Sequence, residues 1–139
     1  MKIIRNNILP PKNFNAINIM GMLFCRKSTE ITPAIVRHEQ IHTRQMIELL
    51  FIGFYIWYFF EWLIRLPMKG NAYFNISFER EAYDHMYDKN YLKRRKRYAW
   101  MKYYKLTHSW TDKRFTNKGM PSQYTLVVYL IREFLAPTF

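Results

Sequence analysis

The feature that most constrains the fold of this chain is an HExxH motif at residues 38–42. Its two histidines, His38 and His42, lie on one face of the chain only if the segment is an α-helix, because residues four apart are neighbours there. Both imidazoles can then bind one metal ion, and Glu39 projects beside it. Gln45, one turn beyond His42, is placed to orient an imidazole. This arrangement is typical of hydrolysis by a metal-activated water.

The residues before the motif predict where its helix begins. Thr32 is a favourable N-cap, and Pro33 fits the first helical position, where its missing N–H is not needed. Further upstream, residues 16–25 alternate partly between apolar and polar side chains, which favours a β-strand. We therefore expect a short strand region followed by the metal helix. The alternative is an ordinary helix that carries two histidines on one face.

Two histidines leave a catalytic zinc site one protein ligand short, because such sites usually have three protein ligands and one open position. The next histidine in the chain is His85, far from the motif, so a downstream carboxylate is the expected third ligand. Residues 75–84 contain two, Glu79 and Glu81, in a segment with apolar residues at helical spacing. The spacing leaves both glutamates open as the ligand.

The motif and the downstream Glu79-Arg-Glu-Ala82 together resemble the gluzincin class of zinc peptidases. Residues 14–98 also resemble small bacterial metallopeptidases with this layout. The resemblance implies a minimal zincin-like core in which Glu79 is the third ligand of Zn²⁺, and Ala82 lets two helices approach closely. It implies a peptide or protein substrate. The chain departs from the class at Tyr83, where many relatives have an aspartate that supports the site.

The catalytic roles follow from the residue types. Glu39 is the expected general base, which takes the water proton and delivers it to the leaving amine. The developing oxyanion needs a further hydrogen-bond donor, and Tyr83, His85 and Tyr87 are candidates by proximity in sequence. Because Tyr83 shares a helix face with Glu79, we favour Tyr83.

Residues 49–60, between the motif and the downstream glutamates, are apolar and uncharged. They are too few for a membrane-spanning helix, which needs about twenty residues, and a single span would separate His42 from Glu79. A straight helix over residues 42–66 would be about 36 Å long, and the chain could return only if fully extended. We therefore expect a sharp bend near Gly53 and a helical hairpin whose aromatic face packs on the core or rests on lipid.

Length and composition set the wider limits. A chain of 139 residues predicts one domain, which we divide into a metallopeptidase-like core (14–98) and a C-terminal extension (99–139). The expected fold class is α+β, mainly α, with a strand region, the HExxH helix and a glutamate helix. The single cysteine, Cys25, excludes an internal disulfide, and the N-terminus lacks the apolar stretch of a signal peptide. These features favour a cytoplasmic protein.

The charge balance points to an anionic partner. The chain has 22 Lys and Arg against 10 Asp and Glu, a net charge of +12, and its basic run at residues 93–97 is followed by aromatic side chains. We expect peripheral binding to the inner face of the cell membrane, and we disfavour nucleic acid because no nucleic-acid-binding motif is present. The alternative to a peptidase is a non-catalytic zinc-binding or basic aromatic membrane-binding module. An intact Glu39 favours the enzyme.

Overall fold

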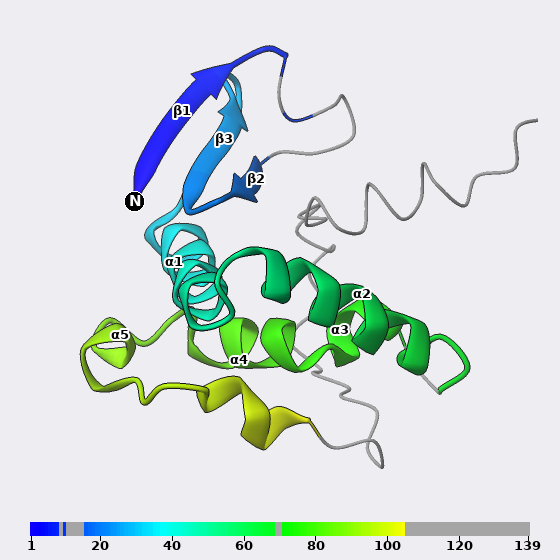
Figure 1. Cartoon of the computed structure of the whole chain (residues 1–139). Coiled ribbons are helices and arrows are strands. Elements are labelled where there is room, and N and C mark those ends of the chain that lie inside the picture. The colour runs from blue at the N-terminus through cyan, green and yellow to red at the C-terminus, as the bar shows by residue number, and fades with distance from the viewer. Residues whose placement is uncertain (9, 11–15, 69–70, 105–139) are drawn as a thin grey trace, which may run out of the picture.

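The computed structural model describes residues 1–8, 10, 16–68 and 71–104, and it confirms an α+β fold that is mainly helical. Within these residues a small sheet lies at one end, and the helices lie together on the other side of it (Figure 1). The strands are β1 (Lys2–Asn6), β2 (Ala16–Ile19) and β3 (Met22–Arg26), and the helices are α1 (Pro33–Glu48), α2 (Ile52–Arg65), α3 (Ala72–Asn75), α4 (Ser77–His85), α5 (Tyr91–Arg94) and the 3-10 helix η1 (Ala99–Tyr103).

The sheet has the order β1-β3-β2, with β1 parallel and β2 antiparallel to β3. Residues 16–25 therefore fall in a hairpin of two strands, where the sequence suggested one. Met20 and Gly21 make its turn, with φ of 51° and 82°, the positive values that a two-residue hairpin turn requires. A Cβ on Gly21 would lie 3.1 Å from the Cγ2 atom of Thr43 in α1, so this turn lies directly against α1.

Helix α1 begins as the sequence predicts. Pro33 is its first residue, and the hydroxyl of Thr32 accepts a hydrogen bond from the Ile35 N–H at 3.3 Å. The helix then continues for 16 residues to Glu48. The motif at residues 38–42 therefore lies in the middle of the helix, where backbone hydrogen bonds hold the residues on both sides of it.

The predicted bend is present, but it lies before Gly53. Helices α1 and α2 meet at 107°, and Gly53 is inside α2. The Phe51 N–H bonds to the Met46 carbonyl at 2.7 Å and the Leu50 N–H to the Ile47 carbonyl at 3.3 Å, which is the Schellman pattern of a helix C-terminus. Leu50 has a φ of 53°, the left-handed conformation that glycine usually takes in this motif.

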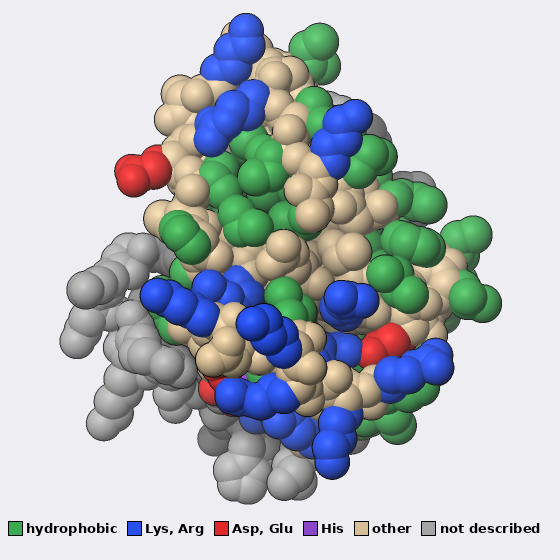
Figure 2. Space-filling model, turned by 90° about the vertical axis from the view of Figure 1, so that its left-hand side faces the viewer, with side chains coloured by type: hydrophobic (Ala, Val, Ile, Leu, Met, Phe, Trp, Pro, Cys, Tyr) green, Lys and Arg blue, Asp and Glu red, His purple; other side chains and the backbone are tan. Residues whose placement is uncertain are grey.

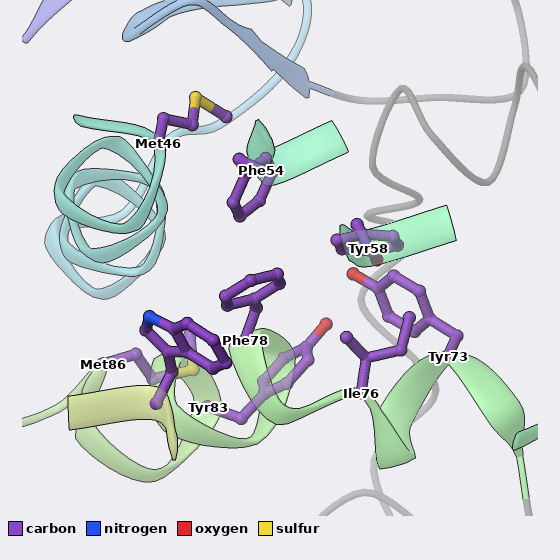
Figure 3. Packing of buried hydrophobic residues seen from close by; sticks show 9 residues of the cluster. Met46, Phe54, Tyr58, Tyr73, Ile76, Phe78, Tyr83 and Met86 are labelled. Carbon is purple, nitrogen blue, oxygen red and sulfur yellow. The ribbon is translucent and has the colours of Figure 1, made fainter. Parts of the chain in front are cut away.

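Helices α2, α3, α4 and η1 enclose a core rich in aromatic side chains (Figure 3). Phe54 and Tyr58 from α2 pack against Phe78 from α4, with ring centroids 4.7 and 6.3 Å apart. Trp100 from η1 packs against the same phenylalanine at 4.7 Å. The described part of the C-terminal extension thus contributes to the core. The division at residue 98 stays a prediction, and residues 105–139 lie outside the described part.

Candidate metal centre

Three buried side chains from two helices converge at one point. His38 and His42 come from the middle of α1, and Glu79 comes from the first turn of α4. The two Nε2 atoms are 3.0 Å apart, and the Glu79 carboxylate oxygens lie 3.3 Å from His38 Nε2 and 3.4 Å from His42 Nε2. Each residue is at most 1% exposed. The structure therefore brings together the three residues that the sequence predicted as metal ligands.

The spacing of these atoms fits a divalent metal. Zinc bonds of about 2.0–2.1 Å in a tetrahedral site place the ligand atoms about 3.3 Å from one another, close to the distances of 3.0, 3.3 and 3.4 Å found here. Three electron-pair donors this close repel one another unless a proton or a cation lies between them. The cluster can therefore hold a metal ion, and its donor set of two imidazoles and one carboxylate suits zinc.

Gln45 orients one of the two imidazoles, as its position predicted. Its amide nitrogen donates to the Phe78 carbonyl at 3.1 Å and to the Glu81 carboxylate at 3.1 Å. Its oxygen, 2.7 Å from His42 Nδ1, must then accept a hydrogen bond from that nitrogen. In the neutral form of the imidazole the proton is therefore on Nδ1, and the lone pair of Nε2 is free to bind a metal in the cluster.

Glu81 lies in a different network from Glu79. It accepts hydrogen bonds from the Tyr91 hydroxyl at 2.7 Å and from the Arg95 guanidinium at 3.2 Å, in addition to that from Gln45. Arg95 also pairs with Glu48 at the end of α1. Glu81 therefore fastens α4 and the basic segment to α1, and of the two candidate glutamates only Glu79 belongs to the cluster.

Tyr58 is a contact of the site that the sequence did not suggest. Its hydroxyl donates a hydrogen bond to the Glu79 carboxylate at 2.9 Å. The two residues are far apart in the chain, and Tyr58 lies among apolar residues that read as core. No local pattern distinguishes it from the aromatic residues beside it, because the contact depends on how α2 crosses α4.

Glu39 lies on the same part of α1, and it is 7% exposed. Its carbonyl accepts hydrogen bonds from the Asn18 side chain at 2.8 Å and from the Thr43 hydroxyl at 3.0 Å, so strand β2 is tied to the helix at this residue. The charge of its carboxylate is among the causes that raise the pKa of His42. Glu39 therefore lies within electrostatic reach of the cluster.

Of the three proposed oxyanion donors, only Tyr83 contacts the site. Its ring lies 4.5 Å from that of His38, and burial, helped by the negative charge of Glu79, raises the pKa of its hydroxyl. The phenol therefore keeps its proton at neutral pH. His85 instead stacks on Tyr91, and Tyr87 is 66% exposed. The role of Tyr83 in stabilising an oxyanion stays a prediction.

Zinc binding should strengthen as pH rises through neutrality. Burial lowers the pKa of His42, but the adjacent Glu79 carboxylate overcomes this effect and raises it to about 9, so the metal-free protein carries a proton that zinc must displace. The association constant should therefore rise about tenfold per pH unit from about pH 7 to 9. The same proton affects folding. Between about pH 6.5 and 9 His42 is protonated in the folded metal-free protein but not in the unfolded chain, so the free energy of unfolding should fall as pH rises through this range.

Calorimetric zinc titrations in two buffers of different ionisation enthalpy test this expectation directly, since they count the protons released at each pH. Release of about one proton per zinc near pH 7.5 is the expected result. An association constant that does not change between pH 7 and 8.5 would contradict it.

No protein-family model, no curated protein and no solved structure matches this chain. Its function must therefore be inferred from the site itself. There, the motif predicted from spacing and the glutamate predicted from resemblance meet within hydrogen-bonding distance.

Proposed function

We propose that this protein is a zinc-dependent metallopeptidase that hydrolyses peptide bonds. The observation that carries the proposal is the buried convergence of His38, His42 and Glu79, with Glu39 next to them on α1. A purely structural zinc site needs its ligands alone, whereas hydrolysis also needs a carboxylate that moves protons. The presence of a ligand set together with an additional carboxylate favours a catalytic site.

Each residue has a defined task in this proposal. His38, His42 and Glu79 hold the metal, which when bound supplies Lewis-acid activation of water and of the scissile carbonyl. Glu39 accepts a proton from the attacking water and returns it to the leaving amine. Tyr83, which stays protonated, is the candidate donor to the developing oxyanion.

The edge of the sheet supports a peptide as the substrate. β2 pairs with β3 on one side, and within the described residues no strand pairs with its other side. An extended peptide could add to this edge through main-chain hydrogen bonds. Because Asn18 of β2 bonds to the Glu39 carbonyl, such a peptide would run alongside the part of α1 that carries the base.

A second candidate is a non-catalytic module that zinc stabilises. The burial of all three ligands favours it, since structural zinc sites are closed to solvent. Both candidates require the same ligands. They differ in whether Glu39 acts as a general base. We favour the enzyme because a carboxylate beside the metal adds nothing to a structural site.

The first experiment is the zinc content of the purified protein and of three single variants, Glu79→Gln, Glu81→Gln and Glu39→Gln, measured by mass spectrometry. The wild type should bind one zinc per chain. Loss of a direct ligand in Glu79→Gln should weaken binding by more than about a hundredfold, because removing only a supporting residue costs about 10–100-fold. The other two variants should keep their zinc.

The two remaining variants are matched controls, because each changes one buried carboxylate on the same two helices. Equal zinc content in all four proteins would show that Glu79 is not a ligand. Absence of zinc from the wild type after incubation with the metal would refute the metal centre altogether.

A further inference from the structure

Helix α2 has its charged side chains inside and its apolar side chains outside. Glu61 and Arg65, its only charged residues, are 1% and 0% exposed and lie on the face that also buries Phe54 and Tyr58. Every exposed side chain of α2 is apolar. An ordinary surface helix has the opposite arrangement. An exposed apolar face of this kind is typical of a surface that binds a partner or a membrane.

The exposed residues form a continuous stripe along the helix. Ile52, Ile56, Phe60 and Ile64 recur every four residues and are 72%, 53%, 57% and 47% exposed. The stripe continues past the bend to Leu50, which is 84% exposed. We call these five residues the α2 stripe. No single helix of the described part is long and apolar enough to cross a membrane, although α1 and α2 together, bent at 107°, pass that test by length and composition.

A basic pocket lies at the end of α1, and the Leu50 N–H of the stripe bonds to the carbonyl of Ile47, one of its lining residues. Arg44, Arg95 and Arg97 line it together with Ile47 and Glu48. Figure 2 shows Lys and Arg side chains gathered over the lower part of one face of the molecule, with hydrophobic side chains at its right-hand edge.

Two of these arginines are available to an external anion. Arg95 is held by Glu48 and Glu81, whereas Arg44 and Arg97 are exposed and have no ion pair with any carboxylate of the described residues. The pocket therefore has an uncompensated positive charge next to an apolar surface.

The positive charge beside the α2 stripe favours one of the two partners that could cover it, a second copy of the chain or a lipid bilayer. A second copy of the chain would bring its own Arg44 and Arg97 and its own net charge of +12 to the contact, and like charges oppose such a dimer. An anionic bilayer offers phosphates for the arginines and acyl chains for the stripe. A helix of 14 residues is about 21 Å long and suits an orientation in the plane of the bilayer.

We propose that the α2 stripe rests on an anionic phospholipid bilayer, with Arg44 and Arg97 against the headgroup phosphates. Binding of this kind combines buried apolar area with electrostatic attraction, and each part alone is weak. The proposal is independent of the metal centre, because the stripe and the pocket lie on surfaces that do not include the zinc ligands.

The test is co-sedimentation of the full chain with vesicles of phosphatidylcholine alone and of phosphatidylcholine mixed with phosphatidylglycerol. The wild type should bind the mixed vesicles and should not bind the vesicles of phosphatidylcholine alone. The double variant Ile56→Glu and Phe60→Glu should lose more than about tenfold in affinity, since it places two charges where the acyl chains would lie. Ile3→Glu with Ile8→Glu makes the same change of charge at residues that are 41% and 85% exposed outside α2, and this variant should bind nearly as the wild type does.

A second pair of variants tests the electrostatic part. Arg44→Gln with Arg97→Gln should weaken binding to the mixed vesicles by about thirtyfold. Lys2→Gln with Lys27→Gln removes the same charge from exposed positions of the sheet region and should have a much smaller effect. Equal losses in the two pairs would show that net charge acts without the pocket and would overturn the proposed docking.

Three further results would overturn the proposal: no binding to the mixed vesicles, equal binding by the stripe variant, or a wild-type dimer that the stripe variant dissociates in sedimentation equilibrium. The last result would assign the stripe to a second copy of the chain. Zinc content of the stripe variant separates this test from that of the metal centre, because it should equal that of the wild type whichever way the vesicle experiment turns out.

Discussion

Glu39→Gln is expected to abolish peptide hydrolysis while zinc stays bound. Glutamine has nearly the same shape as glutamate, so the helix and the ligands should keep their positions, but an amide cannot accept the proton of the attacking water. Loss of a general base typically lowers kcat by about 10²–10⁴-fold. The measurement is kcat/KM of the zinc-loaded wild type and variant on a library of fluorogenic peptides, with zinc content determined on the same samples.

Glu30→Gln is the matched control for this variant. Glu30 is an exposed glutamate just before α1, so its replacement removes one negative charge without touching the cluster, and activity should be unchanged. Full activity in Glu39→Gln would exclude Glu39 as the base. A zinc-loaded wild type that cleaves no peptide would instead favour the non-catalytic module.

The parts of the site predicted from sequence are those that local rules determine. The N-cap at Thr32, Pro33 at the first helical position, and the one-turn spacing of His38 and His42 depend only on residues close together in the chain. Gln45 follows from the same spacing. These predictions are confirmed because helix geometry decides them without reference to the rest of the fold.

The choice between Glu79 and Glu81 is of a different kind. Residues two apart on a helix point in widely different directions, so the sequence indicates that only one of the two carboxylates can reach the His38 and His42 pair but does not show which. The resemblance selected Glu79, and the structure agrees, since Glu81 is held by Tyr91 and Arg95. Which glutamate joins the cluster depends on tertiary contacts, and the spacing of residues in the sequence does not determine it.

The bend and the orientation of α2 show where local rules fail. A glycine is the usual signal for a left-handed residue at a helix end, which favoured Gly53, yet Leu50 takes that conformation here. Likewise, hydropathy would place Glu61 and Arg65 on the outer face of α2. They lie inside because they make their hydrogen bonds to each other and to the start of α4, contacts that only the folded chain supplies.

Glu61→Ala is expected to destabilise the protein by about 3–5 kcal/mol, because it leaves the buried Arg65 guanidinium without its carboxylate. Glu61 accepts hydrogen bonds from Arg65 Nε at 2.8 Å and Nη2 at 2.6 Å, and from the Ser77 N–H at 2.8 Å and hydroxyl at 2.6 Å. Ser77 is the first residue of α4, two positions before Glu79, so the same change should loosen the helix that carries a metal ligand. Urea unfolding of the metal-free protein measures the loss.

Two controls separate the buried charge from other effects of the substitution. Adding Arg65→Met to Glu61→Ala removes the orphaned charge, and replacing a buried ion pair by apolar side chains is often nearly neutral, so the double variant should be more stable than the single one. Asp88→Ala breaks the ion pair with Arg94, whose side chain is 63% exposed, and should cost about 1 kcal/mol or less. If Glu61→Ala were no more harmful than Asp88→Ala, the Glu61 network would not be what holds α4 in place, and the position of Glu79 would have to depend on Tyr58 and the aromatic core instead.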